Sequence, residues 1–138
     1  MICYAVIDTN VLVSALLSGK DDAATVQVVG KLISGEIIPL YSNEITDEYR
    51  EVLNRKKFGF SKDIVEFLLT AVEKFGIQVD PSPSGVVLPD MKDLPFYEVV
   101  LEKRDDGAYL VTGNIKHFPK EPFVVTAREL LDILNEKL

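Results

Sequence analysis

The chain has 138 residues, of which 47% are hydrophobic and 27% charged, a composition that is typical of one globular domain and excludes a disordered segment. The single cysteine, Cys3, and the single histidine, His117, exclude a disulfide scaffold and a tetrahedral zinc site. The net charge of −7 argues against binding nucleic acid by overall charge, so a phosphate ligand would require a metal ion at an acidic site or a local basic patch.

No apolar run approaches the roughly 18 residues that a membrane span requires. The N-terminus also lacks the basic segment ahead of an apolar stretch that marks an exported protein. We therefore expect a cytoplasmic protein with no membrane association.

The N-terminal part of the chain predicts two strands separated by helices. Residues 2–7 form an apolar run typical of a strand that is buried on both faces. A helical pattern follows over residues 11–17. After a polar break at residues 20–22, a second one runs to about residue 34. Residues 37–41 predict a second strand, in which Pro39 is unusual because a proline has no N–H for the strand ladder.

The middle of the chain predicts two helices, a short strand and a loop. Helices are expected over residues 43–57 and 61–75, each beginning at a serine or asparagine suited to cap it. Residues 76–79 predict a third strand, and the proline- and serine-rich residues 81–85 predict a surface loop.

The C-terminal part returns to the same alternation. A helix begins at Asp93 or Leu94, strands are expected over residues 108–112 and 123–125, and Thr126 caps a helix that runs to the C-terminus. Strands that alternate with helices, and that are apolar on both faces, indicate an α/β fold with a mostly parallel sheet.

Polar side chains follow the first and fourth expected strands directly. In an open parallel sheet, ligands bind outside the carboxyl ends of the strands. Asp8 follows the first strand, and Thr112 and Asn114 follow the fourth, so these groups face each other if the two strands are neighbours. Asp8 also stands where it could cap the next helix, but Thr9 and Asn10 can share that capping.

A second candidate, Glu48, lies on the helix expected over residues 43–57. The apolar stripe of this helix includes Ile45, Tyr49 and Val52. Of the four acids on the helix, Glu48 lies nearest to that stripe, at the edge of the buried face. The alternative is a rim residue paired with a nearby base such as Arg55.

Two further acids, Asp90 and Asp93, precede the fifth helix. By local rules alone, Asp90 closes a turn and Asp93 caps the helix. Together with Asp8 and Glu48, however, Asp93 makes a set of hard oxygen ligands of the kind that Mg²⁺ and Mn²⁺ prefer. Two such ions about 4 Å apart can clamp the attacking and leaving oxygens of a phosphodiester, and this chemistry needs neither a cysteine nor a histidine.

Four motifs of the chain resemble those of the PIN-domain family, which includes the ribonuclease toxins of bacterial and archaeal toxin–antitoxin pairs. The motifs span residues 6–15, 42–53, 90–96 and 109–114. The resemblance covers nearly the whole chain. It implies that residues 1–138 form a single PIN-like domain, a three-layer α/β/α sandwich around a parallel sheet of about five strands.

The resemblance also implies roles for individual residues. Asp8, Glu48 and Asp93 are similar to the acidic residues that hold Mg²⁺ or Mn²⁺ and carry catalysis in this family. Asn10 is similar to the residue that steadies the first acid, and Thr112 lines the same pocket.

The chain departs from the family pattern at Asn114, where many members have a fourth acid, an aspartate. An asparagine keeps one oxygen ligand but lacks the charge, so a second metal ion is expected to bind more weakly. Asp90 lies one turn from Asp93, and we hypothesise that it compensates.

A basic patch between Arg50 and Lys62 holds five basic residues and one acid. In the simplest interpretation, the patch is an exposed helix end, where the helix dipole favours cations. The alternative is that it contacts the RNA backbone. Lys116 and His117 follow Asn114 closely and give a second basic position. The candidate RNA contacts are Arg55, Lys56, Lys57, Lys116 and His117.

The leading hypothesis is a metal-dependent endoribonuclease that acts on single-stranded or looped RNA. The resemblance further implies a homodimer and an antitoxin protein that blocks the site. The alternative is a catalytically weak PIN-like module that binds RNA or a protein partner without cleavage, which Asn114 and the net charge of −7 favour.

A third hypothesis is phosphoryl transfer, because an aspartate after the first strand also serves phosphatases and receiver domains. Asn10 stands where a haloacid-type phosphatase usually has its second aspartate. The acidic pair that a receiver domain usually carries before the first loop is absent as well.

Overall fold

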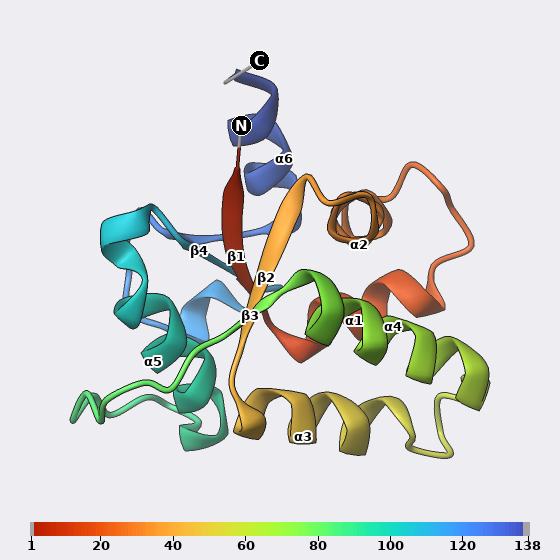
Figure 1. Cartoon of the computed structure of the whole chain (residues 1–138), viewed down its shortest axis with the longest axis horizontal. Helices are drawn as coiled ribbons and strands as arrows, with labels where there is room; N and C mark the ends of the chain where they lie inside the picture. The colour runs from red at the N-terminus through yellow and green to blue at the C-terminus, as the bar shows by residue number, and fades with distance from the viewer. Residues whose placement is uncertain (1, 137–138) are drawn as a thin grey trace.

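The computed structural model describes residues 2–136, in which five strands form one parallel sheet with the order β3-β2-β1-β4-β5 (Figure 1). Each strand pairs in parallel with its neighbour. The strands are β1 (Cys3–Ile7), β2 (Ile37–Tyr41), β3 (Ile77–Gln78), β4 (Tyr109–Val111) and β5 (Val124–Val125). The predicted five-stranded parallel sheet is confirmed, and β1 and β4 are neighbours within it.

Helices cover both faces of the sheet. They are α1 (Thr9–Leu17), α2 (Ala24–Ser34), α3 (Asn43–Leu53), α4 (Lys62–Phe75), α5 (Leu94–Glu102) and α6 (Ala127–Glu136). In Figure 1, α5 lies to the left of β1 and β2, whereas α2 and α4 lie to their right, which gives the three layers of an α/β/α sandwich. Among the described residues, no helix is long and apolar enough to cross a membrane.

The central strands are apolar on both faces because helices cover both. Ala5, Val6 and Ile7 of β1 are almost fully buried, as are Leu110 and Val111 of β4. A strand with only one covered face would alternate polar and apolar residues, and the sequence of β1 does not. The same burial leaves the carboxyl ends of the strands as the place where polar side chains begin.

Pro39 lies inside β2, a strand with neighbours on both sides. Its missing N–H is tolerated because β3 begins to pair only opposite Leu40, one residue later. The chain approaches Pro39 closely at Gly76, where a Cβ atom would lie 2.4 Å from the carbonyl oxygens of both Pro39 and Val72. Glycine therefore allows the close entry of β3 beside β2.

The helix expected over residues 43–57 is shorter in the structure, so that boundary was wrong. It ends at Leu53, where Asn54 follows and donates its side-chain amide to the carbonyl oxygen of Arg50 at 2.8 Å. The Phe58 N–H then donates to the carbonyl oxygen of Arg55 in a turn. Much of the basic patch therefore projects from a turn and not from a helix face.

Other boundaries shift by one to four residues, and the largest of these shifts is at the start of α2, which begins at Ala24. The strands of the structure are shorter than expected at one or both ends, apart from β2, and the first helix begins at Thr9. Three short 3₁₀ helices that the sequence did not indicate are η1 (Met91–Asp93), η2 (Arg104–Asp106) and η3 (Ile115–His117). Of the expected C-terminal helix, residues 137 and 138 lie outside the described part of the chain.

Two glycine-to-alanine variants test the packing at Gly76. Gly76→Ala is expected to lower the free energy of unfolding by about 1–3 kcal/mol, because the new methyl group meets two backbone carbonyl oxygens that cannot move independently. Gly30→Ala, on α2 with open space around it, is expected to raise stability by about 0.5–1 kcal/mol. Urea unfolding followed by circular dichroism measures both, and equal effects would contradict the packing argument.

Candidate functional site

The carboxylate of Asp8 lies at the carboxyl end of β1 and is only 5% exposed. Its backbone N–H donates to the carbonyl oxygen of Val111 at 2.9 Å, which continues the β1–β4 ladder. Its Oδ2 accepts hydrogen bonds from the Thr112 hydroxyl at 2.8 Å and from the Asn10 amide at 3.3 Å. Asp8 occupies the N-cap position of α1, but its side chain makes no capping hydrogen bond. Its carboxylate instead bonds to the residues that follow β1 and β4.

The loops after β1 and β4 are joined by further hydrogen bonds. Asn10 donates to Asp8 and accepts from the Gly113 N–H at 3.1 Å. The Asn114 N–H donates to the same Thr112 hydroxyl, at 2.9 Å. Because each polar group serves two partners, the Asp8 carboxylate is held in one orientation.

Glu48 reaches the same region from α3. It is half-buried, whereas the other three acids of this helix are exposed. The Thr9 hydroxyl, one residue after Asp8, donates a hydrogen bond to Glu48 Oε2. The next residue, Tyr49, is fully buried and donates its hydroxyl to the carbonyl oxygen of Ile7. These two bonds fix α3 across the end of β1.

Asp93 reaches the region from the junction of η1 and α5. Its side chain makes no capping bond, so the prediction that it caps the helix was wrong. Its Oδ2 instead lies 3.3 Å from Nδ1 of His117. Asp90 accepts the Lys92 N–H at 3.0 Å, which confirms that it closes the turn.

A cleft of about 350 Å³ opens where these elements meet. Asp8, Glu48, Asp90 and Asp93 all line it. Cationic side chains are fewer there, and Arg55 is already bonded through two nitrogens to Glu51, at 2.9 and 3.2 Å. The cleft therefore concentrates negative charge.

The electrostatics of the three main acids reflect this crowding. Burial is the largest cause that raises the pKa of Asp8, to about 6 from its ordinary 3.8, and the charge of Asp93 adds to it although the Thr112 hydrogen bond opposes it. Burial first, and then the charge of Asp8, raises the pKa of Glu48 against the effect of Thr9. Burial and the charge of Asp90 raise the pKa of Asp93. A cation bound near these carboxylates would favour their charged forms and so lower the pKa of all three.

These acids suit a hard divalent cation in chemistry but do not yet converge on one point. Within residues 2–136, no three Asp, Glu, His or Cys side chains lie close enough as they stand to hold one ion. The carboxylate of Glu48 instead accepts a hydrogen bond from Thr9, and that of Asp93 lies 3.3 Å from Nδ1 of His117.

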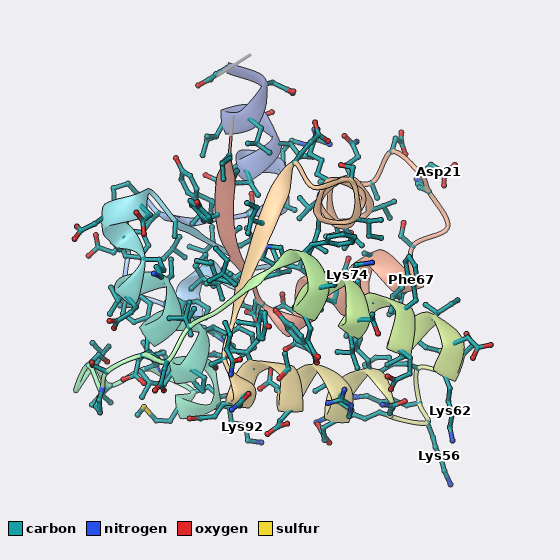
Figure 2. All side chains as sticks on the ribbon, viewed as in Figure 1. Asp21, Lys56, Lys62, Phe67, Lys74 and Lys92 are labelled. Carbon is teal, nitrogen blue, oxygen red and sulfur yellow. The ribbon has the colours of Figure 1, made fainter. Side chains whose placement is uncertain are left out.

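The candidate RNA contacts divide into two groups. Arg55 and His117 line the cleft, and Lys116 lines an adjoining hollow of about 360 Å³ beside Asn114. Lys56 extends into solvent at the corner between α3 and α4 (Figure 2), and Lys57 is exposed in the same turn. Asn114 is exposed and lines the cleft as well.

Five residues that were not selected from the sequence as site residues also line the cleft, namely Thr9, Val13, Val52, Phe58 and Lys92. Thr9 could have been found from its place directly after Asp8. Lys92 stands between the two acids of the 90–96 motif. For Phe58 the only signal is an aromatic residue within the basic patch.

A family model described as PIN domain matches residues 4–116. The matched range contains Asp8, Glu48, Asp93 and Asn114, and it ends one residue before His117. Searches of curated proteins and of solved structures gave no match.

The raised pKa of Asp8 should make the free energy of unfolding depend on pH. A pKa of about 6 in the folded state, above the ordinary 3.8, means that protonation of Asp8 favours folding below about pH 4 and that this contribution is lost as the pH rises through 6. Asp8→Asn should therefore stabilise the metal-free protein at pH 8, by up to about 3 kcal/mol, and have little effect at pH 4. Urea unfolding in EDTA at pH 4, 6 and 8 measures this, and a loss of stability at pH 8 would refute it.

Proposed function

This chain belongs to the PIN-domain family, whose members are generally nucleases, and we propose that it is a divalent-metal-dependent endoribonuclease that hydrolyses RNA phosphodiester bonds in the cytoplasm. The observation that carries the proposal is the gathering of Asp8, Glu48 and Asp93 from three separate elements around one cleft. Each of these carboxyl groups has a raised pKa, which is the electrostatic signature of a site that gains from a cation.

In this proposal Asp8, Glu48 and Asp93 hold Mg²⁺ or Mn²⁺. The ion, when bound, lowers the pKa of a water molecule and neutralises charge that develops on the phosphate. Thr112 and Asn10 orient the Asp8 carboxylate, so it can serve as a ligand without losing side-chain entropy on binding.

Positive charge at the rim of the cleft supports RNA as the substrate. Arg55, which follows α3, and Lys92, which lies in η1, both line the cleft. Their charges attract the phosphates that flank the scissile bond, which the net charge of −7 would otherwise repel. With its proton on Nδ1, His117 donates to Asp93 Oδ2 at 3.3 Å and so positions that carboxylate.

We further propose that the protein is the toxin of a toxin–antitoxin pair and that it forms a homodimer. Large exposed apolar side chains support a protein partner: Leu17 on α1, and Ile64 and Phe67 on α4, are 59%, 51% and 60% exposed. Coverage of such side chains by a partner removes apolar surface from water and favours association.

The alternative is a catalytically weak module that binds RNA or a protein. Two observations favour it: Asn114 stands where a fourth carboxylate is common in the family, and the three acids do not converge on one point. The next two experiments separate the alternatives.

Cleavage of a mixed RNA pool by the purified protein tests the main proposal. We expect cleavage in Mg²⁺ or Mn²⁺, its loss in EDTA, and a decrease of about 100-fold or more for Asp8→Asn and Glu48→Gln. The matched control is Asp47→Asn, which removes an exposed acid beside Glu48 on α3 and should keep full activity. Folded protein that cuts no RNA in either metal would favour the binding module.

Metal affinity tests the role of Asn114 and its compensation by Asp90. Asn114→Asp should tighten Mn²⁺ binding by about fivefold or more, because one added charge near the ion contributes about 1 kcal/mol or more. If Asp90 compensates, Asp90→Ala weakens Mn²⁺ binding nearly as much as Asp93→Ala does. Calorimetric titration measures all three variants, and an unchanged affinity in Asp90→Ala would rule out compensation.

A further inference from the structure

Two phenylalanine rings stack on each other in the turn that joins α3 to α4. The ring centroids of Phe58 and Phe60 are 5.4 Å apart and their planes differ by only 9°. Gly59 between them has a φ of +67°, a left-handed conformation that favours glycine and lets the two rings lie in register. Phe60 packs against the hydrophobic core, and Phe58 lines the acidic cleft. The core therefore supports one ring, and that ring supports the other at the edge of the cleft.

Cationic side chains accompany the Phe58 ring. The Lys57 ammonium lies 5.1 Å from the ring centroid, and Lys57 is exposed, so its long side chain is able to move. Arg55 lines the same cleft three residues before Phe58. An aromatic ring flanked by cations is the arrangement by which proteins bind single strands of nucleic acid, with bases on the ring and phosphates on the cations.

We propose that Phe58 is a base-stacking residue that seats one nucleotide of the RNA beside the scissile phosphate. The inference rests on the proposed ribonuclease function and adds a specificity-determining residue to it. A base stacks on the Phe58 ring, the Lys57 ammonium moves from the ring to a flanking phosphate, and Arg55 contacts another.

This arrangement selects the form of the substrate. A paired base in a duplex has its faces covered by its neighbours, so only an unpaired or looped nucleotide can stack on Phe58. Because a purine has a larger π surface than a pyrimidine, the position beside the cut favours adenine or guanine. The acidic cleft itself recognises only the phosphate and the metal, so Phe58 supplies the recognition of the base.

The test measures binding without cleavage. The probe is a 12-nucleotide single-stranded RNA that carries the fluorescent base 2-aminopurine, bound to Asp8→Asn protein in Mg²⁺. Stacking on Phe58 should quench the fluorescence. In the same background, Phe58→Leu should abolish the quenching and weaken binding by about tenfold, whereas Phe58→Tyr keeps the ring and should retain both.

Phe75→Leu is the matched control. Phe75 also follows a lysine whose ammonium, that of Lys74, lies over its ring, at 5.7 Å, but it ends α4 and does not line the cleft. Its loss should leave binding and quenching unchanged. Equal binding and quenching in Phe58→Leu and Phe58→Tyr would overturn the stacking inference while RNA binding persists. Failure of the proposed function is a different result, because the unsubstituted protein, with Phe58 intact, would then cut no RNA in Mg²⁺ or Mn²⁺ whether or not the RNA binds.

Discussion

The hydrogen bond from the Thr112 hydroxyl to the Asp8 carboxylate joins the ends of two neighbouring parallel strands, and the rest of the site is arranged around it. It exists because β1 and β4 pair with Ile7 opposite Val111, which places the next residue of each strand side by side. The sheet register thus determines where the first acid lies, before any ligand is present. Burial of that acid is costly, and the cost appears as its raised pKa.

The position of α3 depends on the same strand end. The Tyr49 hydroxyl donates to the carbonyl oxygen of Ile7, and the Thr9 hydroxyl donates to Glu48. Both bonds connect residues far apart in sequence, and neither could be inferred from helical periodicity. A helix that was free to slide along the sheet edge would not keep Glu48 within reach of Asp8.

Under the proposed function, the cleft concentrates acids at the place where an acidic polymer would bind. Asp8 is buried and Glu48 and Asp93 are half-buried, whereas Arg55 and Lys92 line the same cleft but are exposed. The proposed divalent ion would resolve this conflict, because it would neutralise the acids and attract the phosphate. Without a cation, the buried Asp8 carboxylate makes the fold less stable than an uncharged residue at that position would, which is a common relation between function and stability.

Much of the fold, and part of the candidate site, could be predicted from the sequence alone. The apolar runs, their alternation with helical patterns and the acids at the strand ends predicted a parallel α/β sheet, because burial on both faces leaves a local pattern. The edge position of Glu48 also followed from helical periodicity. Only the tertiary structure decided that Asp93 leaves its helix uncapped to meet His117, that the basic patch lies in a turn, and that Phe58 faces the cleft. Each of these depends on a contact between residues far apart in the chain or on a glycine turn, whose outcome is set by packing and has no local signature.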